Sequence, residues 1–106
     1  MATLKLSSLE KFKTLVGHGI TLVDFNAPWC APCHAQEPVL DKIEKIFKGK
    51  ATFTKINIDK NQKVAVQLGI QSIPTLVVYR EGEEIARLIG LQDAPTLQRI
   101  LADIVT

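Results

Sequence analysis

The strongest constraint on the fold is the mostly apolar run at residues 20–26, Ile-Thr-Leu-Val-Asp-Phe-Asn. A strand with apolar side chains on both faces must be covered on both faces, as in the centre of an α/β sheet. The chain has 106 residues, long enough to close one hydrophobic core without metals or structural disulfides. The sequence therefore predicts a single domain over residues 1–106, built on a buried central strand.

Strand-like and helix-like patterns alternate along the rest of the chain. Further strands are predicted at residues 3–6, 52–58, 75–79 and 83–89. A loop is predicted at residues 27–32, and helices are predicted at about 7–16, 33–48 and 59–68, and after Asp93. The first is marked by a Ser7–Glu10 capping box. Two of the helices carry apolar stripes, which comprise Val39, Leu40, Ile43, Ile46 and Phe47 in one and Leu97, Ile100, Leu101 and Ile104 in the other.

The order of these elements predicts the topology. Early strands separated by helices imply parallel crossovers, and the last two strands, joined by a Glu81-Gly82 turn, imply an antiparallel hairpin. The fold class is therefore α/β, with a mixed central sheet of about five strands flanked by four helices. Open α/β sheets place their sites just beyond the ends of central strands, here after residue 26.

Composition narrows the function classes. The net charge is +2, and the 13 basic residues are spread along the chain without a basic run, so neither nucleic acid nor a membrane surface is expected as a partner. No apolar stretch approaches the length of a membrane span. Residues 1–8 do not resemble a signal peptide, so we expect a cytoplasmic protein. No long exposed apolar stripe demands a partner, and we expect a monomer.

The two cysteines, Cys30 and Cys33, fall where the long helix begins. A bridge across so short a loop constrains the unfolded chain little, so a chemical role is favoured over a structural one. Unpaired N–H groups at a helix start stabilise a thiolate and lower the pKa of the first cysteine. Cys30 can then attack a disulfide, and Cys33 can resolve the mixed disulfide. Pro32 lacks an N–H that a helix start does not need.

Other interpretations of this pair remain open on the residues alone. The cysteines match half of a zinc site, for which His18 and His34 are the candidate nitrogen ligands. Cys30-x-x-Cys33-His34 also matches the string that attaches c-type haem. The apolar α/β context and the lack of a distal methionine argue against haem. The cysteines can also be chemically inert.

Asp24 interrupts the apolar run, on the same strand face as Leu22. Burial disfavours a carboxylate, so the pKa of Asp24 is expected to rise. Such a carboxyl near the thiols can take the proton from Cys33 while the mixed disulfide is resolved. The alternative is a buried polar residue that only forms hydrogen bonds.

Several motifs together resemble the thioredoxin family in order and spacing, over essentially the whole chain. They are Val23-Asp24-Phe25, Trp29-Cys30-Ala31-Pro32-Cys33, Asn57-Ile58-Asp59 and Ile73-Pro74-Thr75, with Gly82 and Gly90. The resemblance implies a thioredoxin fold and a reductase of protein disulfides, with Cys30 and Cys33 as a redox-active pair. It also implies no bound cofactor or metal. Electrons would come from NADPH through a flavin-dependent thioredoxin reductase.

The resemblance also implies roles for residues around the pair. Asp24 would be the proton acceptor and Lys55 the lysine that tunes it, although a lone strand lysine is more often solvated. Pro74 would be cis and face the dithiol, leaving the backbone of Ile73 to pair with an extended substrate. A trans proline is the alternative. The expected substrate surface consists of Trp29, Ile73, Pro74, Gly90 and Leu91.

The chain departs from the common family pattern at three positions. Ala31 replaces a frequent glycine, Asn26 a frequent tryptophan and His34 a frequent lysine. With Pro32, Ala31 and His34 are expected to tune the redox poise, since residues between and beside the cysteines help to set it. The three departures therefore leave open whether the pair reduces or forms disulfides in its substrates. An oxidant or isomerase, or a binding module with incidental thiols, are the alternatives to a reductase.

Overall fold

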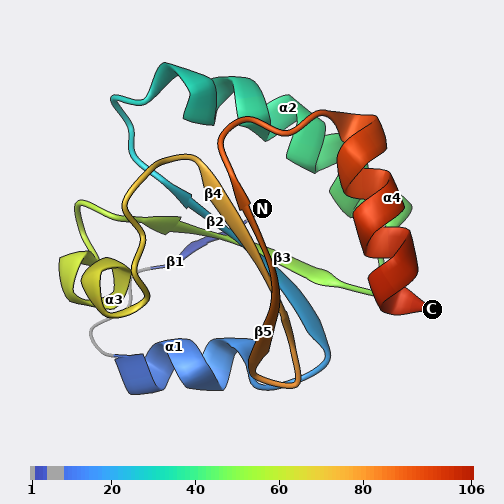
Figure 1. The fold of residues 1–106 in the computed structure, drawn as a ribbon, viewed down its shortest axis with the longest axis horizontal. Coiled ribbons are helices and arrows are strands. Elements are labelled where there is room, and N and C mark those ends of the chain that lie inside the picture. The colour runs from blue at the N-terminus through green and yellow to red at the C-terminus, as the bar shows by residue number, and fades with distance from the viewer. Residues whose placement is uncertain (1, 5–8) are drawn as a thin grey trace.

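The computed structural model describes residues 2–4 and 9–106, which form a five-stranded sheet covered by helices (Figure 1). The order of elements matches the predicted order. They are β1 (Ala2–Leu4), α1 (Leu9–Val16), β2 (Ile20–Asn26), α2 (Ala31–Ile46), β3 (Thr52–Asn57), α3 (Gln62–Gln67), β4 (Thr75–Arg80), β5 (Glu83–Ile89) and α4 (Ala94–Val105).

The sheet has the strand order β1-β3-β2-β4-β5, with β2 at its centre. β2 pairs in parallel with β3 and antiparallel with β4, and β4 pairs antiparallel with β5. Asp24 lies opposite Lys55 of β3 on one side and Leu76 of β4 on the other. This confirms the predicted mixed sheet with β2 at its centre, and residues 21–25 of that strand are buried whereas its two end residues are partly buried.

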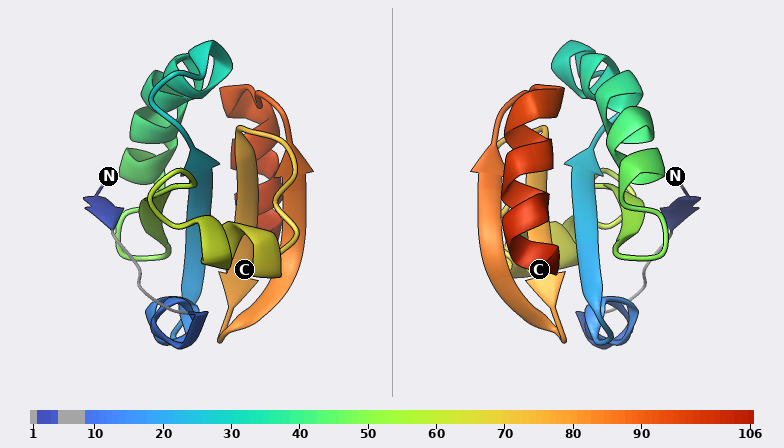
Figure 2. Two further views of the ribbon diagram at one scale, coloured as in Figure 1. Left: turned by 90° about the vertical axis from the view of Figure 1, so that its left-hand side faces the viewer. Right: turned by 90° about the vertical axis from the view of Figure 1, so that its right-hand side faces the viewer.

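Helices cover both faces of the sheet, with α2 beside α4 and α1 beside α3 (Figure 2). Alternation along β2 divides its side chains between two apolar clusters. Leu22 belongs to the cluster under α2 and α4, whereas Val23 and Phe25 belong to the cluster under α1. By the same alternation, Asp24 lies on the α2 face.

Boundaries differ from the prediction mainly at turns. α3 begins at Gln62 rather than at residue 59, because Asn57 Oδ1 accepts the N–H groups of Asp59 and Lys60 and holds them in a turn. α2 begins at Ala31, inside the predicted loop, because Pro32 suits the first turn of a helix, and it ends at Ile46, with Phe47 as its C-cap. Part of the strand predicted at 3–6 and the predicted Ser7 cap lie outside the described residues.

One member of the predicted α2 stripe was placed wrongly. Leu40 and Ile43 are fully buried, but Ile46 is 43% exposed. At 100° per residue, Ile46 lies on the opposite side of Ile43 from the buried Phe47. It therefore falls at the edge of the stripe, beyond the reach of the sheet.

Candidate active site

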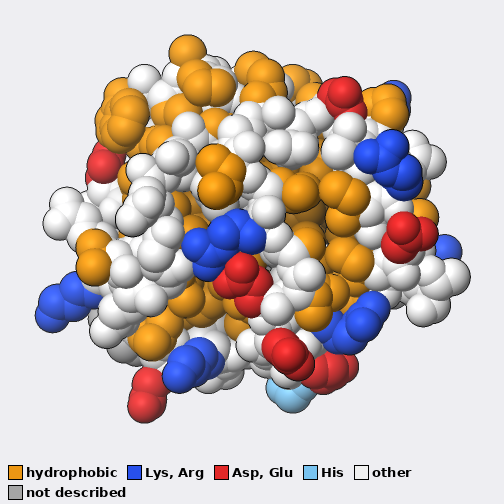
Figure 3. Space-filling view, in the orientation of Figure 1, with side chains coloured by type: hydrophobic (Ala, Val, Ile, Leu, Met, Phe, Trp, Pro, Cys, Tyr) orange, Lys and Arg blue, Asp and Glu red, His pale blue; other side chains and the backbone are white. Residues whose placement is uncertain are grey.

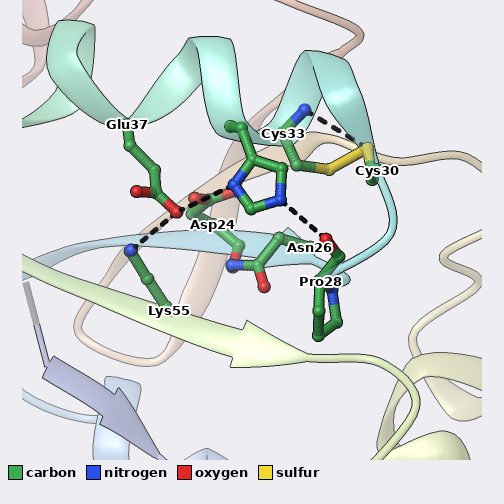
Figure 4. A network of polar contacts seen from close by, with 8 residues as sticks. Asp24, Asn26, Pro28, Cys30, Cys33, Glu37 and Lys55 are labelled. Carbon is green, nitrogen blue, oxygen red and sulfur yellow. Dashed lines mark hydrogen bonds and ion pairs between the residues drawn. A yellow bond between two sulfur atoms is a disulfide. The ribbon is translucent and has the colours of Figure 1, made fainter.

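Cys30 and Cys33 form a disulfide at the first turn of α2, just past the end of β2 (Figure 4). Their Cα atoms are 5.2 Å apart. Cys30 is the N-cap of α2, and the N–H of Cys33 donates to Cys30 Sγ at 3.2 Å. A helix-terminal N–H aimed at this sulfur favours negative charge on it. The predicted advantage of Cys30 as a thiolate thus has a direct structural basis.

The disulfide is part of a small apolar cluster. Both cysteines are buried with Ala27, and the partly buried Ile58 and Ile73 pack against them. Cys30 Sγ lies 3.8 Å from the carbonyl oxygen of Ile73. The Ile73–Pro74 peptide bond is cis, as the family resemblance implied. The structure therefore brings the 73–74 segment against the first cysteine.

Exposed apolar side chains gather beside this cluster, at the upper left of Figure 3 over the loop that joins β2 to α2. Trp29 is 69% exposed and Leu91 53%, so neither is a core residue. The indole Nε1 of Trp29 donates to Asp59 Oδ2 at 2.8 Å, which fixes the ring at the end of β3. The prediction did not include Ile89, which is also largely exposed at the end of β5.

Gly90 connects two of the predicted substrate segments. Its N–H donates to the carbonyl oxygen of Pro74 at 2.8 Å. Its φ of +90° lies in a region that a residue with a Cβ rarely adopts, so glycine suits this turn. This hydrogen bond ties the turn that precedes Leu91 to the Ile73–Pro74 segment.

Asp24 is fully buried beneath the first turn of α2 (Figure 4). Among the residues that the structure describes, neither of its carboxylate oxygens has a hydrogen-bond partner. Asn26 Nδ2 donates instead to the main-chain oxygen of Asp24 at 3.2 Å. Burial raises the pKa of Asp24 from 3.8 to about 6, against the opposing effects of the Asn26 amide and the Lys55 ammonium.

A network of polar side chains lies between Asp24 and solvent. Lys55 Nζ is 3.2 Å from Glu37 Oε1, and His34 Nδ1 is 3.9 Å from the same oxygen. The other ring nitrogen of His34, Nε2, lies 2.6 Å from the carbonyl oxygen of Pro28. Since a carbonyl oxygen only accepts, Nε2 carries a proton. The recorded contacts of His34 are thus with Pro28 and Glu37 rather than with sulfur.

Sequence reasoning missed two residues of α2 that belong to this site. Glu37 is one turn beyond Cys33, a spacing that places both side chains on one helix face. Gln36 is fully buried, and its amide forms two hydrogen bonds with the main chain of Gln92, at 2.9 Å to the oxygen and 2.8 Å from the N–H. Gln36 could have been found from its spacing, because it lies four residues before the buried Leu40 and therefore on the same, buried face of α2.

The zinc interpretation with His18 is inconsistent with this geometry. His18 precedes β2 and the cysteines follow it, so the whole seven-residue strand, about 20 Å long, separates them. Within residues 2–4 and 9–106, no three or more His, Cys, Asp or Glu side chains cluster in a way that could hold a metal ion. Over the same residues, no helix combines the length and hydropathy of a membrane span.

Sequence comparisons place the chain among proteins of one family. The sequence model of the family named thioredoxin matches residues 3–103. Thioredoxin from Chlamydia caviae is 38% identical over 97 residues, which cover 92% of this chain and 94% of the relative. Thioredoxin from Alicyclobacillus acidocaldarius is also 38% identical, over 97% of this chain and 98% of the relative.

Solved structures show the same fold. A point mutant of thioredoxin from Halobacterium salinarum superposes with a TM-score of 0.85 at 29% identity, over 99% of this chain and 92% of that one. Thioredoxin from Trypanosoma brucei brucei gives a TM-score of 0.86 at 27% identity, over 97% of this chain and 90% of that one. With its Cys30–Cys33 pair at the start of α2, the chain belongs to the thioredoxin family of protein-disulfide oxidoreductases.

Proposed function

We propose that the chain reduces disulfide bonds in other proteins, with Cys30 as the attacking thiol and Cys33 as the resolving thiol. The observation that carries this assignment is the contact from the Cys33 N–H to Cys30 Sγ at the N-terminus of α2. It stabilises negative charge on Cys30 and on no other sulfur. Cys30 is also the cysteine beside the carbonyl of Ile73, where a substrate segment would lie.

The reaction proceeds in two exchange steps. The Cys30 thiolate attacks one sulfur of the substrate disulfide, which forms a mixed disulfide and releases the other sulfur as a thiolate that takes up a proton. Cys33 then loses its proton to Asp24 and attacks Cys30 Sγ, which releases the second substrate sulfur. The substrate gains two electrons, and the chain is left with the Cys30–Cys33 disulfide seen in the structure.

The substrate binds over the exposed apolar surface beside Cys30. An extended segment pairs with the backbone of Ile73, a small case of strand addition. Trp29, Pro74, Gly90 and Leu91 contact its side chains. Ala31, Pro32 and His34 set the redox poise of the pair, and Lys55 adjusts Asp24 electrostatically.

The oxidised chain is returned to the dithiol by a reductase that passes electrons from NADPH through a flavin. The cytoplasm suits this direction of exchange, because thiols there are kept reduced. We propose that residues 1–106 act there as one domain and as a monomer. The reducing compartment is supported by the cysteine content, because both cysteines of the chain belong to the redox pair.

The midpoint potential of the Cys30–Cys33 couple tests the direction of exchange. It is measured by thiol trapping after equilibration in dithiothreitol redox buffers. A value near −270 mV, as is typical of reducing members of this fold, supports the reductase. A value near −120 mV is that of a strong oxidant and contradicts it. Cys30→Ser should abolish turnover, and Cys33→Ser should accumulate the mixed disulfide; full function in Cys30→Ser would indicate a binding module instead.

A further inference from the structure

We propose that Glu37 is a positioning residue, whose carboxylate holds the Lys55 ammonium away from Asp24 and leaves that buried carboxyl without a counter-ion. The inference deepens the proposed function, since it rests on Asp24 as the acceptor of the Cys33 proton. It concerns a residue outside the predicted site, on the helix that carries both cysteines.

The geometry gives Lys55 a choice between two carboxylates. Lys55 stands directly beside Asp24 in the register of β2 and β3, and its side chain is only 20% exposed. Its ammonium nevertheless pairs with Glu37, at 3.2 Å. Between the described residues Lys55 and Asp24 the structure records no ion pair, and both Asp24 oxygens lack a hydrogen-bond partner there. The cation that the sheet register places beside Asp24 is therefore paired with a half-exposed carboxylate instead.

Few other polar groups face Asp24. Asn26 of β2 lies beside it, and the first turn of α2 with Cys33 lies above it (Figure 4). Its neighbour on β4, Leu76, is apolar. His34 reaches the network only through Glu37. The electrostatic balance at Asp24 thus depends mainly on how far Glu37 compensates Lys55.

This arrangement suits a group that must accept a proton near neutral pH. An unopposed ammonium beside Asp24 would hold it ionised and make it a weak base. With Lys55 compensated, burial dominates and the carboxyl keeps a raised pKa, to which Glu37 itself also contributes. General bases work best when their pKa is near the working pH.

The decisive variant is Glu37→Gln, which removes the charge and nearly keeps the shape. The carboxyl carbon of Asp24 is followed by NMR as the pH of the oxidised protein is changed. With Lys55 released to interact with Asp24, the titration midpoint should fall by about one pH unit. An unchanged or higher midpoint would overturn the inference. As a matched control, Asp41→Asn makes the same charge change one turn further along α2 and should leave the midpoint in place.

A double-mutant cycle shows whether Glu37 acts through Lys55. Lys55→Gln alone should raise the Asp24 midpoint. In the Lys55→Gln background, Glu37→Gln should have only a small residual effect; a full downward shift there would mean that Glu37 acts directly, and would contradict a positioning role.

Rates separate this inference from the proposed function. The release of substrate from the mixed disulfide is measured against pH in the wild-type chain and in Glu37→Gln. A profile displaced with the NMR midpoint supports both proposals. A displaced midpoint with an undisplaced rate profile supports the role of Glu37 and contradicts that of Asp24 as the proton acceptor.

Discussion

Two buried polar groups on neighbouring strands share one anomaly. Among the described residues, the carboxylate of Asp24 on β2 and the hydroxyl of Tyr79 on β4 have no hydrogen-bond partner. Burial raises the pKa of both, to about 6 for Asp24 and about 12 for Tyr79. Their surroundings differ, because Asp24 lies under the disulfide helix whereas Tyr79 packs against Phe12 of α1, in an edge-on contact with ring centroids 5.3 Å apart.

The difference shows that an unpaired buried group is informative only together with what lies near it. Asp24 lies beneath the disulfide turn of α2 and next to the charged pair Lys55–Glu37, and its raised pKa of about 6 is close to neutral pH. Tyr79 stays protonated at any pH the chain meets, and its ring contributes packing. We therefore expect the two groups to respond differently to the same kind of substitution.

The largest contrast is expected in catalysis. If Asp24 accepts the Cys33 proton as proposed, Asp24→Asn should slow resolution of the mixed disulfide at pH 7 by about 10²-fold. Tyr79→Phe should leave the rate unchanged. The measurement is stopped-flow release of a chromophoric thiol from a mixed disulfide on Cys30. Equal rates in all three proteins would remove the distinction between the two groups.

The next contrast is in how stability depends on pH. Since the folded pKa of Asp24 lies above its unfolded value of 3.8, folding is favoured when Asp24 is protonated. That stability is fully present below pH 3.8 and is lost as the pH rises through about 6. The loss amounts to about 3 kcal/mol of unfolding free energy.

Urea unfolding of the oxidised protein measures this loss when it is repeated from about pH 3.5 to about pH 7.5, an interval that contains both pKa values of Asp24. The loss should be present in the wild-type chain and in Tyr79→Phe, and absent in Asp24→Asn. The same pH dependence in Asp24→Asn as in the wild type would show that another group is responsible.

A third buried polar side chain, Gln36, sharpens the comparison because, unlike Asp24 and Tyr79, it has hydrogen-bond partners. Gln36→Leu should lower the unfolding free energy by about 2 kcal/mol, since it leaves the N–H and carbonyl of Gln92 unpaired. Urea unfolding at one pH measures it. Gln92→Ala keeps the main-chain partners and should cost less than about 1 kcal/mol. A larger cost for Gln92→Ala than for Gln36→Leu would mean that the buried amide is not the important link.

The smallest effect is expected for the stability of Tyr79→Phe. The substitution removes a hydroxyl that is buried without a partner and keeps the ring against Phe12, so stability should stay the same or rise by up to about 1 kcal/mol. Chemical denaturation at neutral pH measures the change. A loss of more than about 1 kcal/mol would indicate that the hydroxyl is paired in solution.

The sequence was sufficient for those parts of the site that depend on position within one element. The end of an apolar strand and the start of a helix placed Asp24, Cys30 and Cys33 together. Gln36 and Glu37 were missed because periodicity assigns a residue to a helix face but does not identify its partner. Their partners, Gln92 and Lys55, are distant in sequence.

Local side-chain chemistry explains the remaining differences. The late start of α3 follows from the Asn57 side chain, which competes for N–H groups that a helix would otherwise use. The cis bond before Pro74 followed only from the family resemblance, because a proline by itself favours trans. Ile46 shows that a stripe drawn from spacing is wider than the face the sheet can cover.

The bond from the Gly90 N–H to the Pro74 oxygen has a consequence for the newly made chain. Both cysteines leave the ribosome before the peptide at 73–74 that packs against them, and the amide that braces this peptide follows later still. The surroundings of the redox pair are therefore complete only after residue 90 has been made, well after both thiols are present in the chain.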